Sequence, residues 1–235
     1  MIDLYYASTP NGWKISIMLE ECGLEYRTNM VNLSERAQFE PGFISVNPNS
    51  KIPAIVDHNP KGGGGPITVF ESGAILLYLA EKTGRYIPDT EAGRYAVIQW
   101  LMWQMAGLGP MLGQHGHFKL YAAEHNEYAI NRYRSETERL YAVMNRRLSD
   151  NSYLGGADYS IADMACFPWV RTYKAQEIDL ALNYPNVRQW YDRLKSRPRL
   201  QRGVSLGRDV QRGSVSSDRK NAGKMPLSSK ENGVK

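Results

Sequence analysis

The chain has little cysteine: Cys22 and Cys166 are the only two among its 235 residues. They form neither a Cys-x-x-Cys pair nor a spacing that suits a metal site. So few cysteines are typical of proteins from reducing compartments, and they argue against a fold held by disulfides. Both lie in helical apolar stretches, so we expect two small buried side chains and not reactive thiols.

Long apolar runs are also missing. No stretch of about 18 or more consecutive apolar residues occurs, which argues against a membrane-spanning helix and a membrane partner. The first residues, MIDLYYASTPNGWK, lack the basic segment followed by an apolar one that marks a secretion signal, so we expect a cytoplasmic protein. The pair His115 and His117 has no third ligand nearby, so we expect no metal.

An excess of one charge is absent from most of the chain, although its net charge is +5. Residues 199–235 hold 9 Lys and Arg against 3 Asp and Glu, and subtracting these from 29 and 24 leaves 20 and 21 for residues 1–198. The positive charge therefore belongs to the C-terminus, and we expect no nucleic-acid partner. Residues 204–235 are poor in apolar side chains and are expected to form a disordered basic tail. The alternative for this tail is a weak anion- or membrane-binding arm.

Residues 1–85 alternate between strand and helix patterns. Residues 2–6 and 26–31 read as strands on either side of a helix in which apolar side chains recur at helical spacing and which Gly23 ends. Two strands joined through a helix predict a βαβ unit with a parallel pair.

The next two strands are predicted to form a hairpin. Residues 54–57 and 67–70 are short apolar runs, and the segment between them contains four consecutive glycines. A helix over residues 72–83 follows. The order βαβ and then ββα predicts a thioredoxin-like domain.

The rest of the chain reads as helical and predicts an all-helical C-terminal domain over residues 91–203. The predicted helices lie near residues 94–107, 126–148, 160–175 and 186–196. Gly107, Gly109 and Pro110 predict a break or kink at the end of the first one. Ser160 and Asp163 form a capping box.

Glu71 and Ser72 mark the point where the last predicted strand passes into a helix. Ser72 suits the N-cap position, and a helix N-terminus offers free N–H groups and a partial positive charge to a carboxylate. Glu71 beside it suits an ammonium group. The two together fit the free amino-acid end of a γ-glutamyl peptide, although the pair taken alone is better explained by an ordinary helix cap with an acidic neighbour.

Lys51, Ile52 and Pro53 precede the third predicted strand. A cis bond before Pro53 would turn the backbone N–H and C=O of Ile52 outward, where they suit the middle of a peptide ligand. Few X–Pro bonds are cis, so only the surrounding order of strands and helices favours this reading.

Thr9 and Asn11 occupy the turn between the first strand and its helix, where cysteine-dependent thioredoxin-fold enzymes keep their nucleophile. A hydroxyl and a carboxamide are poor nucleophiles without a strong base, but each can donate a hydrogen bond to a thiolate. Lowering a thiol pKa by about 2 units needs about 2.7 kcal/mol, most of which one charge-assisted hydrogen bond provides. Taken alone, the two residues are better explained as a plain turn and helix cap.

These segments together resemble the cytosolic glutathione transferases of the Nu class, the bacterial disulfide-bond reductases of that fold. The chain is also similar to the yeast prion-forming nitrogen regulator. The resemblance runs from residue 2 to about residue 202. It is carried by TPNG (9–12), NSKIPAIVDH (49–58), FESGAILLYLAEKTG (70–84), GLGPMLGQ (107–114) and YSIAD (159–163).

The resemblance implies a homodimer that takes glutathione as co-substrate. It implies a glutathione site at Asn11, Gln38, Lys51, Ile52, Pro53, Glu71, Ser72 and Arg132, with Thr9 near the sulfur. Gln38 and Arg132 rest on the resemblance alone. Trp13 departs from the smaller or histidine side chain common in relatives, which affects substrate fit at the mouth of the site.

The function expected is reduction of disulfides with glutathione, with Thr9 and Asn11 as thiolate-stabilising catalytic residues. Conjugation of glutathione to electrophiles, or peroxide reduction, is the alternative within enzymes. A regulatory protein that binds glutathione without chemistry is the alternative outside them.

Overall fold

A four-stranded mixed sheet forms the N-terminal half of the protein. In the computed structural model, which describes residues 1–207, the strands are β1 (Ile2–Tyr6), β2 (Tyr26–Met30), β3 (Ala54–Asp57) and β4 (Ile67–Phe70), in the order β2-β1-β3-β4. β1 and β2 are parallel, and β3 pairs antiparallel with both β1 and β4. The predicted parallel pair and the predicted hairpin are therefore confirmed.

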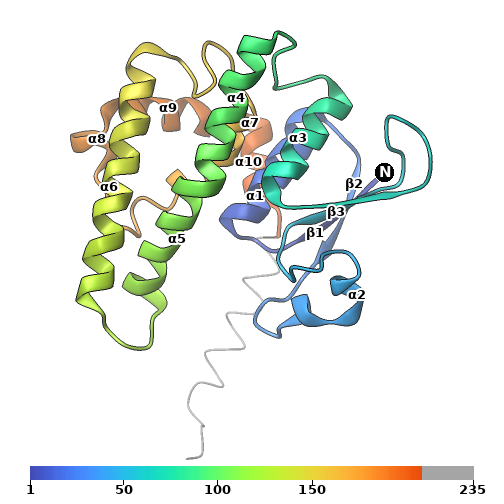
Figure 1. Ribbon diagram of the computed structural model, residues 1–235, viewed down its shortest axis with the longest axis horizontal. Coiled ribbons are helices and arrows are strands. Elements are labelled where there is room, and N and C mark those ends of the chain that lie inside the picture. Colours follow the sequence, from blue (N-terminus) through green and yellow to red (C-terminus); the bar gives the residue numbers. More distant parts are fainter. Residues whose placement is uncertain (208–235) are drawn as a thin grey trace, which may run out of the picture.

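The two predicted helices pack together beside this sheet: α1 (Pro10–Cys22) and α3 (Ser72–Thr83) (Figure 1). α1 has proline at its first position, and Gly23 ends it with φ of 67°, a left-handed conformation that glycine adopts without steric cost. Apolar side chains of α1, including Ile15, Met18 and Leu19, are fully buried. The thioredoxin-like prediction is confirmed.

The connection from β2 to β3 holds two short elements, η1 (Ala37–Phe39) and α2 (Pro41–Ile44). The buried Asn47 side chain fixes the loop after them. Its Nδ2 donates to the carbonyl of Lys51 at 2.6 Å, and its Oδ1 accepts from the N–H of Asn49 at 2.9 Å. This loop therefore delivers Lys51 and Ile52 to a fixed place beside the sheet.

The C-terminal half is all-helical, as predicted. Its elements are α4 (Glu91–Trp103), the π-helix η2 (Gln104–Leu108), α5 (Gly109–Gly116), the π-helix η3 (His117–Tyr121), α6 (Glu127–Asp150), α7 (Ile161–Val170), α8 (Leu180–Asn183), α9 (Pro185–Lys195) and α10 (Pro198–Ser205). They stand beside the sheet half, with α6 and α8 farthest from the sheet (Figure 1). None of the helices in the described part of the chain has the length and apolar character that a membrane crossing needs.

The structure differs from the helix prediction in two details. The break or kink predicted near Gly107 takes the form of η2, a π-helical stretch that separates α4 from α5. α7 stops at Val170 and not near residue 175, since the Thr172 hydroxyl donates to the Trp169 carbonyl at 2.6 Å and turns the chain there.

α1 joins the two halves, because α7 and α10 from the helical half pack on it. A Cβ on Gly203 of α10 would lie 2.6 Å from the Cα of Ile17, so only glycine permits this approach. The tail predicted from residue 204 lies, from residue 208, outside the described residues, while residues 204 and 205 still belong to α10.

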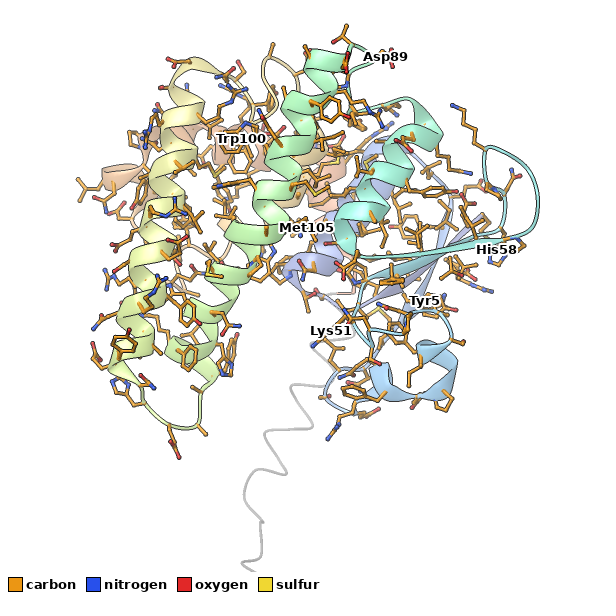
Figure 2. All side chains as sticks on the ribbon, viewed as in Figure 1. Tyr5, Lys51, His58, Asp89, Trp100 and Met105 are labelled. Atoms are coloured by element: carbon orange, nitrogen blue, oxygen red, sulfur yellow. The ribbon has the colours of Figure 1, made fainter. Side chains whose placement is uncertain are left out.

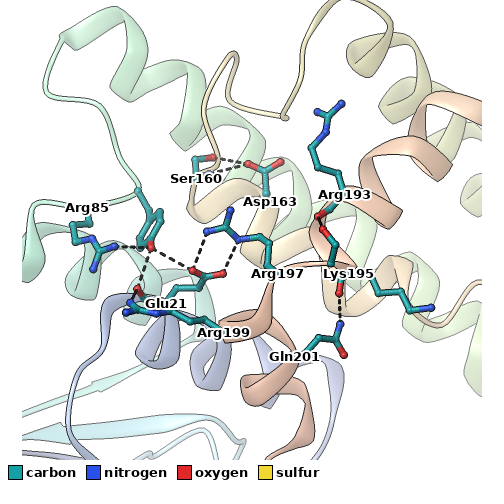
Figure 3. Close-up of polar contacts among 11 residues, drawn as sticks. Glu21, Arg85, Ser160, Asp163, Arg193, Lys195, Arg197, Arg199 and Gln201 are labelled. Atoms are coloured by element: carbon teal, nitrogen blue, oxygen red, sulfur yellow. Dashed lines mark hydrogen bonds and ion pairs between the residues drawn. The ribbon is translucent and has the colours of Figure 1, made fainter.

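Buried polar contacts strengthen this junction (Figure 3). The carboxylate of Glu21, 2% exposed, accepts from the Arg197 guanidinium at 2.7 and 3.0 Å. Nearby, the buried Asp163 carboxylate accepts from the N–H and hydroxyl of Ser160, both at 3.0 Å, and from Trp190 Nε1 at 2.8 Å. The predicted capping box is thus confirmed and is also tied to α9.

Candidate active site

The N-terminus of α1 carries Thr9 as its N-cap. The Thr9 Oγ1 accepts from the N–H of Gly12 at 3.3 Å, which leaves the hydroxyl proton available for donation. Gly12 is required here, because a Cβ would lie 2.1 Å from the carbonyl oxygen of Ala7. The TPNG sequence therefore has a local structural reason for three of its residues: a cap, a proline in the first turn and a close approach.

Asn11 is held from the other half of the protein. Its Oδ1 accepts from the indole Nε1 of Trp169 on α7 at 3.1 Å. An indole N–H only donates, so the contact fixes the Asn11 amide with its oxygen toward Trp169 and its NH₂ group free to donate. Thr9 and Asn11 thus both retain a donor at a helix N-terminus, where the partial positive charge favours an anion.

A cavity of about 150 Å³ lies beside these residues. It is lined by Asn11, Asn47, Lys51, Ile52, Pro53, Glu71, Ser72 and Met105. The Ile52–Pro53 peptide bond is cis. Ile52 precedes β3, and among the described residues its backbone makes none of the hydrogen bonds of turns, loops and caps. Six of the nine predicted site residues therefore meet around one cavity. Lys51 comes to this cavity from the sheet half and Met105 from the helical half (Figure 2).

Glu71, and not Ser72, is the N-cap of α3, which corrects the prediction. Glu71 has φ of 68°, a left-handed conformation unusual for a residue with a side chain, and such strain concentrates at functional sites. Ser72 is the first helical residue and is 4% exposed, so its backbone N–H belongs to the unpaired first turn of the helix. The Glu71 side chain is exposed beside it. The first turn of α3, which suits an anion, therefore lies next to the exposed carboxylate of Glu71.

Lys14 is a residue that sequence reasoning missed. It is 1% exposed, and its Nζ donates to Ser72 Oγ at 3.1 Å, to Gln104 Oε1 at 2.6 Å and to Met105 Sδ at 3.3 Å. Burial lowers the pKa of Lys14 to about 7. Its position four residues before Met18, on an apolar helix face, is the signal that was available.

A second cavity, of about 600 Å³, opens on the other side of Thr9. Trp13, Leu112, Leu120 and Trp169 give it apolar walls, and Arg171 and Lys174 add positive charge. The Arg171 guanidinium lies over the Trp13 ring, 4.8 Å from its centroid. Trp13, expected at the mouth of the site, therefore lines the larger cavity. Thr9 borders this cavity, while Asn11 borders the smaller one.

Comparisons with known proteins agree with this geometry. The description "Glutathione S-transferase, N-terminal domain" matches residues 9–82, and "Glutathione S-transferase, C-terminal domain" matches residues 127–193. The chain is 56% identical over 198 residues to the disulfide-bond oxidoreductase YfcG of Escherichia coli, an alignment that covers 84% of this chain and 92% of the relative. The chain belongs to the glutathione S-transferase family.

Solved structures of this transferase family have the same fold. A glutathione transferase from Burkholderia graminis with two glutathione molecules per subunit has a TM-score of 0.84 and 46% identity, covering 87% of this chain and 88% of that one. One from Pseudomonas putida, with one glutathione disulfide per subunit, has a TM-score of 0.83 and 43% identity, covering 87% and 91%. Ure2p in complex with glutathione has a TM-score of 0.80 and 29% identity, covering 86% and 92%. The family and fold predicted from the motifs are confirmed.

Two of the predicted glutathione contacts line neither cavity of this transferase. Gln38 lies on η1, and its Oε1 is buried with no partner among the described residues. Arg132 lies exposed on α6. Since both came from the resemblance alone, their roles stay predictions.

Neither cysteine borders the two cavities. Cys166 is fully buried on α7, and burial raises the pKa of its thiol well above the ordinary value. Cys22 is the last residue of α1, at the end away from Thr9, and burial raises the pKa of its thiol as well. Both groups are therefore protonated near neutral pH and poor nucleophiles.

Proposed function

We propose that this transferase binds glutathione in the smaller cavity and uses the glutathione thiolate to reduce disulfides. The observation that carries the proposal is the position of Thr9 and Asn11, two free donors at the α1 N-terminus between the two cavities. A sulfur placed there would receive hydrogen bonds and the partial positive charge of the helix.

The peptide would lie along the smaller cavity. Its γ-glutamyl carboxylate would accept from the first turn of α3 at Ser72, and its ammonium would pair with Glu71. Its cysteine backbone would pair with the N–H and C=O of Ile52, which lies before β3 and outside the strand pairing of the described residues. Lys51, at the edge of the same cavity, would attract the glycine carboxylate.

The chemistry needs no protein nucleophile. The glutathione thiolate attacks one sulfur of the substrate disulfide, a mixed disulfide forms, and the other sulfur leaves as a thiolate. A second glutathione thiolate then attacks the glutathione sulfur of the mixed disulfide, which yields glutathione disulfide and the second substrate thiol. The larger cavity has room for the second sulfur compound. Related proteins are named disulfide-bond oxidoreductases, and others hold two glutathiones or one glutathione disulfide per subunit.

Conjugation of glutathione to electrophiles is the second candidate. It is favoured by the apolar walls of the larger cavity, where Trp13, Leu112 and Trp169 would hold an aromatic substrate. Turnover on a model disulfide, compared with turnover on a model aryl halide, separates the two.

We further propose a cytoplasmic homodimer. Glutathione chemistry and two protonated cysteines suit a reducing compartment. A second subunit would also account for Arg132, which stands exposed on α6 and would reach glutathione only from the partner.

Thr9→Ala tests the proposal directly. We expect disulfide reductase turnover to fall about tenfold or more, because one charge-assisted hydrogen bond to the thiolate is lost. The matched control is Thr90→Ala: Thr90 caps α4 by accepting from Gly93 N–H at 3.3 Å, the same geometry as Thr9, and borders neither cavity. Both variants lose about 1 kcal/mol of capping, and only Thr9→Ala should lose turnover. Equal turnover in the two variants would refute the role of Thr9.

A further inference from the structure

Lys14 carries its charge into the interior without a counterion. Among the described residues no carboxylate lies within ion-pair distance of its Nζ, and its hydrogen-bond partners are Ser72, Gln104 and Met105. An unpaired buried charge costs free energy, so a lysine at this position needs a reason other than stability.

The contact with Ser72 determines where the serine proton points. An ammonium group only donates, so Ser72 Oγ accepts from Lys14 and cannot direct its own proton toward Nζ. That proton now points to Met105 Sδ at 3.6 Å, a weak acceptor. Since Ser72 lines the smaller cavity, a carboxylate bound there is a far better acceptor for the same proton.

The charged and titratable groups around Lys14 are few. Glu71 at the start of α3 and Cys166 on α7 are the two that interact with its charge. η2 presents only the neutral Gln104 and Met105. The arginines nearby lie at the opposite end of α1, where Arg197, just before α10, pairs with Glu21 and Arg202 of α10 pairs with Glu20.

We propose that Lys14 is a positioning residue for the γ-glutamyl carboxylate of glutathione, acting through Ser72. The ammonium holds Ser72 Oγ as an acceptor, so the serine hydroxyl donates to the ligand carboxylate, and this carboxylate supplies the counterion that Lys14 lacks. The inference rests on the proposed function, because it assigns a group to the same glutathione site.

The arrangement couples glutathione binding to a proton. A bound carboxylate favours protonated Lys14, so binding raises the pKa of a group that titrates near 7 in the free protein. The protein therefore takes up a proton on binding, and the affinity for glutathione is highest below the pKa that Lys14 has in the free protein. Above that pH the affinity falls, because the ligand must then recruit a proton.

Calorimetric titration of the full chain with S-methylglutathione, which lacks a titrating thiol, tests this coupling. We expect the Kd of the wild type to be about five- to tenfold larger at pH 8 than at pH 6. In two buffers of different ionisation enthalpy at pH 7.5, we expect uptake of roughly half a proton per site. The second measurement needs no variant, and absence of uptake would overturn the proposal.

Lys14→Met removes the charge and should bind more weakly at pH 6, with a Kd that no longer changes between pH 6 and 8. The matched control is Lys51→Met, which removes a lysine from the same cavity and should keep the wild-type pH dependence. A pH dependence that survives in Lys14→Met would overturn the role of Lys14 while leaving glutathione binding intact. A wild type that binds no S-methylglutathione at any pH would instead overturn the proposed glutathione site and this inference with it.

Discussion

Lys14 holds a positive charge where water does not reach, and this costs folding free energy. Burial lowers its pKa to about 7 from an ordinary value of 10.5. The folded state therefore binds fewer protons than the unfolded state between about pH 7 and 10.5. Stability rises with pH across this window, and the full cost is present below it.

Lys14→Met should consequently change stability in a pH-dependent way. Relative to wild type, the variant should gain about 2–3 kcal/mol more in free energy of unfolding at pH 6 than at pH 9, because only the wild type has the buried charge. Guanidinium unfolding at the two pH values measures this difference. The same relative stability at both pH values would contradict the account, and the exposed Lys51→Met should show no such difference.

At the same scale, the sequence predicted some site residues and missed others for a physical reason. Thr9, Asn11 and Glu71 were found because turns and helix starts are local features. Lys14 was missed because its burial depends on Gln104, 90 residues away, and the contact of Asn11 with Trp169 spans 158 residues. Periodicity along one helix does not contain such contacts.

At the scale of elements, η2 and the start of α5 position the partners of Lys14 and Asn11. This π-helix provides Gln104 and Met105 to Lys14, and the helix that follows begins at Gly109. A Cβ on Gly109 would lie 2.5 Å from Gln104 Nε2 and 3.2 Å from Trp169 Nε1. Gly109 thus leaves room for the partner of Lys14 and for the partner of Asn11.

Gly109→Ala should reduce glutathione-dependent turnover about tenfold or more, because small displacements of positioning groups are costly in catalysis. Gly107→Ala is its matched control, since a Cβ there meets only Leu140 at an ordinary 3.6 Å. The control should keep its turnover and gain about 0.5–1 kcal/mol of stability. Steady-state kinetics and thermal unfolding of the pair provide the measurement. Full activity in Gly109→Ala would show that Gln104 and Trp169 need no fixed position.

The elements themselves were largely predictable. Strand alternation, Gly23 and the glycine-rich hairpin act over a few residues, and the strands and the first two long helices lie where these patterns placed them. Gly107, Gly109 and Pro110 predicted a break or kink but not its π-helical form. α7, which packs on α4, η2 and α5, lies far along the chain and is not part of that local pattern.

At the scale of the whole molecule, the two halves are joined through α1. Glu21 on α1 is nearly fully buried, whereas the side chain of its partner Arg197 is 33% exposed. Arg197 also lies over the Tyr159 ring, 4.2 Å from the centroid. The two partners therefore differ in what their loss would cost. Removing Arg197 leaves a buried carboxylate unpaired, whereas removing Glu21 leaves a guanidinium that water can reach.

Arg197→Ala should destabilise the protein by about 3–5 kcal/mol, since it leaves a buried carboxylate unpaired. Glu21→Ala should cost less, because Arg197 can turn to solvent. Asp192→Ala, which breaks the exposed pair with Arg188, should cost about 0.5 kcal/mol and serves as the surface control. Chemical denaturation of the three variants gives the order. A larger loss for Glu21→Ala than for Arg197→Ala would contradict it.

In the chemistry proposed for this transferase, the reactive sulfur belongs to glutathione and not to the protein. The most direct test is the turnover of a Cys22→Ser, Cys166→Ala double variant on a model disulfide with glutathione. We expect turnover within about twofold of wild type, because Cys166 is buried and Cys22 half-buried, and both thiols are protonated and outside the cavities. Loss of disulfide reduction in this variant, with its fold intact by circular dichroism, would show instead that a thiol of the protein takes part in the reaction.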